Sequence, residues 1–148
     1  YGLRPAERRT LFARIARIAR RRQLMLVVAG SDRLGRAPRH GRHRGALTAP
    51  VHSQREAVAA IRNGAALLFV SPVHATRSHP GSAALGRVRL GLLIRDLNVP
   101  VIALGGMNER RWRALRPLGV HGWAGIDAWA AGSRRRFSSG RVENGGFP

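Results

Sequence analysis

The chain has 148 residues, 44% of them hydrophobic, which is enough to bury the core of one domain. It has no apolar run of about eighteen residues or more, so the sequence predicts no membrane span. The absence of cysteine excludes disulfides and thiolate metal sites and is compatible with a reducing cytoplasm, which is the location we expect.

The charge is strongly basic, because 27 arginines stand against 7 acidic residues and the net charge is +20. Such a surface attracts polyanions, so a basic nucleic-acid-binding protein is one alternative. The sequence contains no Lys, however, its arginines are scattered along the chain, and aromatic residues make up only 5%. A coding bias toward Arg also explains this pattern, and we favour it over a nucleic-acid interface.

The N-terminal part of the chain predicts one helix and one strand. The chain starts at Tyr1 without a secretory signal, and we interpret this as a truncated start. Residues 5–22 have the apolar spacing of an amphipathic helix, with Pro5 in the first turn and arginines on the other face. Residues 24–28 are a continuous apolar run, which is typical of a strand covered on both faces.

The middle of the chain predicts a polar segment, a short strand and a helix. Residues 31–45 are polar and rich in Gly, Arg and His, with at most a short helix or strand, and a short strand follows at 47–51. Ser53 and Glu56 form a capping box that begins a helix, and Gly64 ends it.

The C-terminal half repeats the order of strand, loop and helix. Its expected strands are residues 66–70, 99–104 and 122–126, and its expected helices are residues 87–96 and a helix from Asn108 to about residue 118. A loop rich in Pro, Ser, His and Gly separates the first of these strands from the next helix. Residues 132–148 are expected to be a disordered basic tail after a domain of residues 1–131.

The regular return of strand, loop and helix predicts an α/β fold with a parallel sheet. Closed into a barrel, such a sheet places its functional loops after the carboxyl ends of the strands. A doubly wound open sheet is the alternative, but no Gly-x-Gly-x-x-Gly motif opens a helix after the first strand.

The pair Gly105-Gly106 follows a buried strand and precedes a helix. Two glycines at this place let backbone N–H groups approach an anion closely, and late loops of parallel barrels often bind phosphate. A tight turn that simply needs glycine is the structural alternative. We favour a phosphate site because of the position of this loop in the order of strands.

Four motifs occur in a characteristic order: VHS at 51–53 with Glu56, FVSPVHATRSHPG at 69–81, PVIALGGM at 100–107 and GVHGWAGI at 119–126. Together they resemble the thiamine-phosphate synthase and thiazole tautomerase family over roughly residues 22–129. The resemblance implies a (β/α)8 TIM barrel that is incomplete here. The strands of this chain would be the third to eighth of the barrel, and the first two would precede Tyr1.

The resemblance implies a transferase of thiamine biosynthesis, which joins a hydroxymethylpyrimidine diphosphate to a thiazole phosphate and releases pyrophosphate. Its diphosphate loop corresponds to Thr76, Ser78 and His79, where His79 replaces a Lys of the family, and we expect Ser78 to be catalytic. The thiazole phosphate would bind at Gly105 and Gly106, with Ile126 and Asp127 at a second phosphate-binding turn. An Asp at that turn repels phosphate unless it is neutralised.

The family uses Mg²⁺, but its carboxylate ligands are not found in this sequence, so no metal ligand is predicted and no cofactor is certain. The Asn-Asp of the family falls on Ala29-Gly30, and its Gly-Gln-x-Asp falls on residues 41–44, which read Gly-Arg-His-Arg. One hypothesis is that Arg42 and Arg44 replace the charge of the metal, since guanidinium binds phosphate in a bidentate fork. A solvated basic loop is the simpler interpretation.

Other activities stay open. In the tautomerase branch of the family a His after the sixth strand acts as acid and base, and its position falls on Pro72 here, so His74 is the nearest candidate. A barrel that binds thiazole phosphate without turnover is a further alternative. We expect His40, His43 and His52 to be loop histidines rather than a zinc site, and the tryptophans to pack in the core. Whether the chain forms a homo-oligomer is left open.

Overall fold

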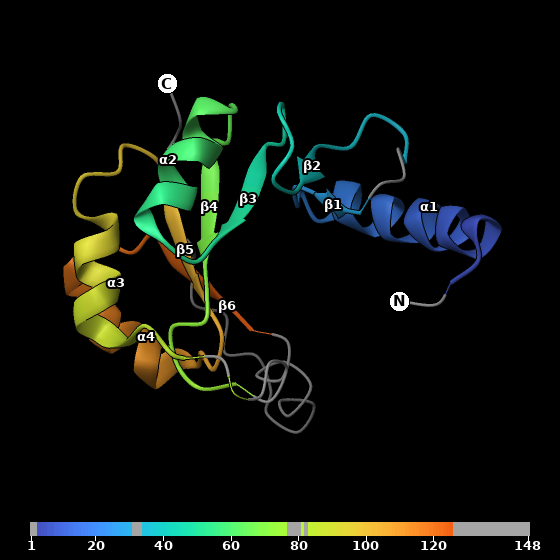
Figure 1. The fold of residues 1–148 in the computed structure, drawn as a ribbon. Coiled ribbons are helices and arrows are strands. Elements are labelled where there is room, and N and C mark those ends of the chain that lie inside the picture. Colours follow the sequence, from blue (N-terminus) through green and yellow to red (C-terminus); the bar gives the residue numbers. More distant parts are fainter. Residues whose placement is uncertain (1–2, 31–33, 77–80, 82, 126–148) are drawn as a thin grey trace.

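The computed structural model describes residues 3–30, 34–76, 81 and 83–125 (Figure 1). These residues form six strands, which are β1 (Val28–Ala29), β2 (Arg39–His40), β3 (Thr48–Val51), β4 (Leu67–Val70), β5 (Val101–Leu104) and β6 (Gly122–Ala124). The helices are α1 (Pro5–Arg21), α2 (Gln54–Arg62), α3 (Gly86–Ile94) and α4 (Glu109–Leu115), and a 3-10 turn, η1 (Arg116–Leu118), follows α4. None of the described helices is long and apolar enough to cross a membrane.

The strands form one parallel sheet in the order β1-β2-β3-β4-β5-β6, so each strand pairs with the next one along the chain. This is the strand order of a parallel barrel, and it confirms the predicted α/β class. Within the described residues the sheet is not closed, because β1 and β6 are its two edges. The structure therefore holds part of a barrel, as the sequence predicts.

The core lies on one face of β3, β4 and β5. Alternate residues of these strands are buried on this face, namely Ala49, Val51, Leu68, Val70, Val101 and Ala103. Buried residues of α2, α3 and α4 complete the same cluster, including Ala57, Leu90 and Leu115. Figure 1 shows these three helices gathered beside β3 to β6. Trp112 and Trp123 pack partly buried against the cluster, as expected, whereas Trp129 lies outside the described residues.

The described residues of the two crossovers beside β2 are not helical. Residues 41–47 connect the parallel strands β2 and β3 without helical structure, and the described residues between β1 and β2, 30 and 34–38, are not helical either. Parallel strands are usually joined by a crossover of a dozen or more residues that contains a helix. The described residues of these two crossovers therefore place no helix over β1 and β2.

The prediction for residues 24–28 is wrong in its main point. Only Val28 belongs to a strand, and Leu24 and Met25 are 63% and 74% exposed rather than covered on both faces. The reason is that β1 is an edge strand with one neighbour, so the apolar run has too few partners. The predicted helix α1 forms, but Leu11, Ile15 and Ile18 on its apolar stripe are exposed for the same reason.

The other helix boundaries follow the predicted caps. The side chain of Ser53 accepts a hydrogen bond from the Glu56 backbone N–H at 3.2 Å, and α2 ends before Gly64, whose φ is +94°. Asn108 caps α4 by accepting from the Arg111 backbone N–H at 2.9 Å. The predicted tail at 132–148 and the end of the last predicted strand lie outside the described residues.

Candidate functional site

The loops that follow β3, β4 and β5 lie at the carboxyl-terminal end of the sheet. Because the strands are parallel and adjacent, their carboxyl ends meet there. His52 follows β3, residues 71–76 follow β4, and the pair Gly105-Gly106 follows β5. The motifs that are far apart in the sequence are thus neighbours in the fold.

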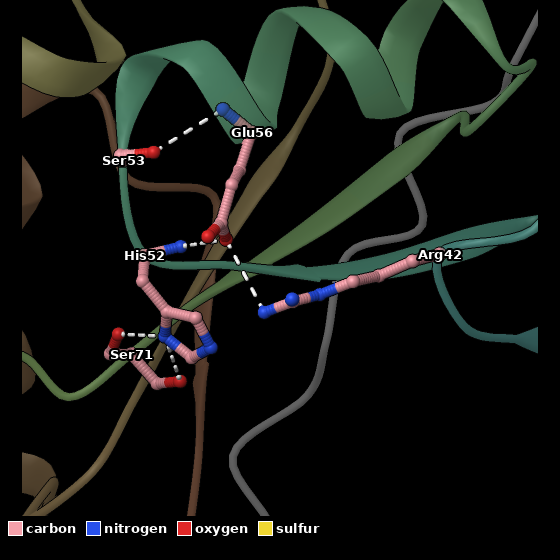
Figure 2. Close-up of polar contacts among 5 residues, drawn as sticks. All are labelled: Arg42, His52, Ser53, Glu56 and Ser71. Carbon is pink, nitrogen blue, oxygen red and sulfur yellow. Dashed lines mark hydrogen bonds and ion pairs between the residues drawn. The ribbon is translucent and has the colours of Figure 1, made fainter.

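His52 and Glu56 connect the loops after β2, β3 and β4 (Figure 2). His52 Nδ1 lies 2.6 Å from the Ser71 carbonyl oxygen, and a carbonyl can only accept, so Nδ1 carries the proton. The Glu56 carboxylate accepts from the His52 backbone N–H at 2.9 Å and pairs with Arg42 at 3.3 Å. In a capping box the Glu56 carboxylate would accept from the backbone N–H of Ser53. Here it accepts from His52 instead, one residue earlier, and so holds the backbone at the end of β3.

The loop after β4 packs directly on the loop after β5. The backbone N–H groups of Val73 and His74 donate to the Leu104 and Gly105 carbonyls at 2.9 and 3.1 Å. A Cβ at Gly105 would lie 2.8 Å from Pro72 Cα, and one at Gly106 would collide with the Ala75 carbonyl oxygen. Both glycines also have positive φ, +91° and +60°. The fold itself therefore requires glycine at both positions. This agrees with the alternative that the pair forms a tight turn that needs glycine.

His74 and Arg111 meet at Gly106. The point where a Gly106 Cβ would be is 3.0 Å from His74 Cβ and 3.2 Å from Arg111 Nη1, and the guanidinium of Arg111 donates to the Gly106 carbonyl. His74 Nε2 is buried and has no hydrogen-bond partner among the described residues. Burial lowers the pKa of His74, and the positive charge of Arg111 lowers it further, so the imidazole is neutral near pH 7.

The structure brings together part of the predicted set. His74, Gly105 and Gly106 are neighbours, and Thr76 follows at the end of the described part of the same loop. Ser78, His79, Ile126 and Asp127 lie outside the described residues, so their placement stays a prediction. Sequence reasoning missed Arg111. An Arg in the first turn of the helix after Gly105-Gly106 is the signal that could have found it.

The described residues do not fit the Mg²⁺ that the resemblance implies. Among the described residues no three His, Cys, Asp or Glu side chains are grouped as a metal site. Ala29 and Gly30 offer no side-chain oxygen, and Arg42 is paired with Glu56. The histidines that were weighed as a zinc site have separate contacts, since His40 Nδ1 lies 2.8 Å from Thr48 Oγ1 whereas His52 bonds Ser71.

Several known proteins similar to this chain are thiamine-phosphate synthases. The family described as thiamine monophosphate synthase matches residues 35–129. A thiamine-phosphate synthase of Chloroflexus aurantiacus is 33% identical over 57% of this chain and 40% of its own length. One of Salinispora tropica is 40% identical over 49% of this chain and 35% of its own length.

A solved structure gives the fold. Thiamine phosphate pyrophosphorylase from Pyrococcus furiosus superposes with a TM-score of 0.69 over 85% of this chain and 69% of its own, at 20% identity. The chain spans two fifths or less of the length of the two relatives named above. The family match covers more than half of the chain and includes the loops after β3, β4 and β5. This chain therefore belongs to the thiamine monophosphate synthase family.

Proposed function

We propose that this chain contributes the thiazole-phosphate half of a thiamine-phosphate synthase site, in a cytoplasmic transferase of thiamine biosynthesis. Family membership supports the class of reaction. The observation that carries the site is the junction at Gly106, where the loops after β4 and β5 meet beside His74 and Arg111. Two phosphorylated small molecules, a thiazole phosphate and a hydroxymethylpyrimidine diphosphate, are the proposed substrates.

Arg111 is the proposed cation for the thiazole phosphate. One of its nitrogens donates to the Gly106 carbonyl, and a guanidinium has five N–H donors, so others remain for an anion. Arg111 is exposed at the end of the sheet where the family motifs gather. A guanidinium held at one end by the loop loses less freedom when it binds phosphate, which favours binding.

The proposed chemistry transfers the pyrimidine methylene from oxygen to nitrogen. The C–O bond to the diphosphate breaks, the electron pair leaves with the diphosphate, and the thiazole nitrogen uses its lone pair to form the new C–N bond. The role of this chain is to hold the thiazole phosphate at Arg111 and the Gly105-Gly106 loop. Thr76, Ser78 and His79 are proposed to hold the departing diphosphate, with Ser78 catalytic and Ile126 and Asp127 at the second phosphate turn.

The positive charge that the diphosphate needs is proposed to come from arginine rather than from Mg²⁺, because the carboxylate ligands are absent from the described residues. Of the two arginines in this hypothesis, Arg42 is the one that the structure ties to the loop after β3, because it pairs with Glu56. If turnover proved to depend strictly on Mg²⁺, this part of the proposal would be wrong.

A tautomerase is the second candidate, and His74 favours it. Its Nε2 is buried without a partner among the described residues, next to the proposed phosphate loop. A neutral imidazole in that place can take a proton from a carbon of a bound thiazole phosphate and return it to another atom of the ring. His74→Gln would then abolish exchange of ring protons with solvent while thiazole-phosphate binding persists.

Calorimetry with thiazole phosphate tests the proposal on the full chain, with and without Mg²⁺ and pyrophosphate. We expect saturable binding that weakens about tenfold or more in Arg111→Gln, because a charge-assisted contact is removed. Arg110→Gln, on the same helix, is the matched control for loss of one positive charge and should bind within about twofold of the parent. Equal losses in both variants, or no binding at all, would refute the site. A coupled assay for thiamine phosphate then separates synthase activity from binding alone.

A further inference from the structure

A cluster of arginines lines a cavity beside β1 and β2, away from the Gly105-Gly106 loop. The cavity has a volume of about 280 Å³ and is lined by Arg36, Arg39, His43 and Arg44 together with small and apolar residues such as Val28. None of the described residues that line it is acidic. Three positive side chains thus line one partly open space.

The polar atoms of this cavity lack partners. Arg39 Nε and His43 Nε2 are buried and have no hydrogen-bond partner in the part of the chain that the structure describes. Leaving a buried donor or acceptor unbonded costs about 1–3 kcal/mol, and the cost is larger for a charged group. Like charges that line one space also repel one another. An anion in the cavity would lower both costs.

Among the described residues, none of those that line the cavity belongs to the loops after β3, β4 and β5. Side chains alternate between the two faces of a strand, and His40 pairs in register with Thr48, so Arg39 lies on the same face as Ala49. Ala49 belongs to the face that the helices cover, on which α2 packs. Arg39 therefore faces the cavity from the outer face of β2, and the described residues of the two crossovers beside β2 are not helical.

The position of His43 is set by a glycine. A Cβ at Gly41 would lie 2.8 Å from His43 Nδ1, so the imidazole lies directly over the Gly41 backbone. The φ of Gly41 is not among the positive values, so a side chain there is excluded by the ring and not by backbone strain. Gly41→Ala would therefore displace His43 and leave the backbone conformation accessible.

We propose that this cavity is a second anion site, which binds inorganic phosphate, diphosphate or the phosphate group of a small ester. Guanidinium groups bind phosphate oxygens in a planar fork, which suits two or three arginines that converge on one space. The volume accommodates a phosphate or diphosphate, given that one water occupies about 30 Å³ in the liquid. The site is independent of the thiazole-phosphate site at Gly106.

Calorimetry with inorganic phosphate and with diphosphate tests the second site on the full chain. The double variant Arg39→Met/Arg44→Gln removes two charges from the cavity, and Arg55→Gln/Arg62→Gln removes two exposed charges from α2 as the matched control. We expect phosphate affinity at this site to fall about tenfold or more in the cavity variant and to stay within about twofold in the control. Arg111→Gln should leave this site unchanged, so that it and the Gly106 site are lost separately.

Thermal unfolding gives a second readout that also checks folding. A ligand that binds only the folded chain raises its unfolding temperature, so phosphate should stabilise the parent and the control more than the cavity variant. Gly41→Ala should weaken binding while the fold is kept, because it moves only His43. The proposal is overturned if both double variants lose affinity equally, or if the parent shows no saturable phosphate binding. It is also overturned if only oligonucleotides bind, with a steep salt dependence that both double variants share.

Discussion

The packing of the loop after β4 on the loop after β5 predicts that Gly106→Ala destabilises the fold more than Gly119→Ala. Both glycines have positive φ, +60° and +85°, so both variants incur backbone strain. They differ in their surroundings. A Cβ at Gly106 would collide with the Ala75 carbonyl oxygen and crowd His74 Cβ, whereas a Cβ at Gly119 would meet no heavy atom within 4 Å.

The expected magnitudes follow from these two contributions. A left-handed backbone conformation costs a residue with a side chain roughly 1–2 kcal/mol relative to glycine, and this cost is common to both positions. Overpacking against neighbours that must move costs roughly 1–3 kcal/mol more, and it applies only at Gly106. The free energy of unfolding should therefore fall by roughly 2–5 kcal/mol in Gly106→Ala and by roughly 1–2 kcal/mol in Gly119→Ala.

Urea unfolding followed by far-UV circular dichroism measures the difference. The comparison is valid if the dependence of the free energy on urea is the same for the parent and both variants, since a changed slope means that the unfolded or native state has changed. Equal destabilisation by the two substitutions would refute the contact between the two loops. Thiazole-phosphate binding should be lost in Gly106→Ala and kept in Gly119→Ala, because only the first displaces His74 and Arg111.

Three further predictions concern the loops and the helix that follow β3 and β4. Ser53→Ala should lower the free energy of unfolding by about 1 kcal/mol in urea unfolding, because the Ser53 side chain caps α2; no loss would mean that the cap contributes nothing. Glu56→Gln should cost less than about 1 kcal/mol through its partly exposed pair with Arg42, and a double-mutant cycle with Arg42→Gln measures this coupling. Burial, helped by Arg111, lowers the pKa of His74 below its ordinary 6.5, so the unfolded chain binds more protons and the free energy of unfolding should decrease as pH falls below about 6.5. His74→Gln should reduce this decrease and His121→Gln should not; an unchanged pH dependence in His74→Gln would contradict the burial of its ring.

The parts of the fold that the sequence predicts well are those with local causes. The caps Ser53 and Asn108 form the expected hydrogen bonds, because a cap needs only a side chain and the first turn that follows it. The strands β3, β4 and β5 are apolar and end in recognisable loops, so their order and burial are predicted as well. The family motifs at residues 69–81 and 100–107 supply His74, Gly105 and Gly106, which the structure shows as neighbours.

The failures depend on partners that a sequence pattern does not identify. The apolar run at 24–28 has the composition of a buried strand, but burial requires neighbours on both sides, and β1 has only one. Arg111 enters the site through a side chain that folds back over Gly106, which no spacing rule predicts. The arginine cavity brings together Arg39 of β2 with Arg36 before it and Arg44 after it, a grouping that no spacing rule predicts.

The departures from the family pattern are concentrated beside β1 and β2. Ala29-Gly30 at the end of β1 and residues 41–44 after β2 fall where the resemblance places metal carboxylates. The described residues of the crossovers on either side of β2 are not helical. The strand order from β3 to β6 and the Gly105-Gly106 loop lie within the family match. The two halves of the proposed reaction therefore have different support, since the thiazole-phosphate half draws on this part alone and the diphosphate half also draws on residues 41–44. Thiazole-phosphate binding without Mg²⁺ is for this reason the first property to measure, and turnover the second.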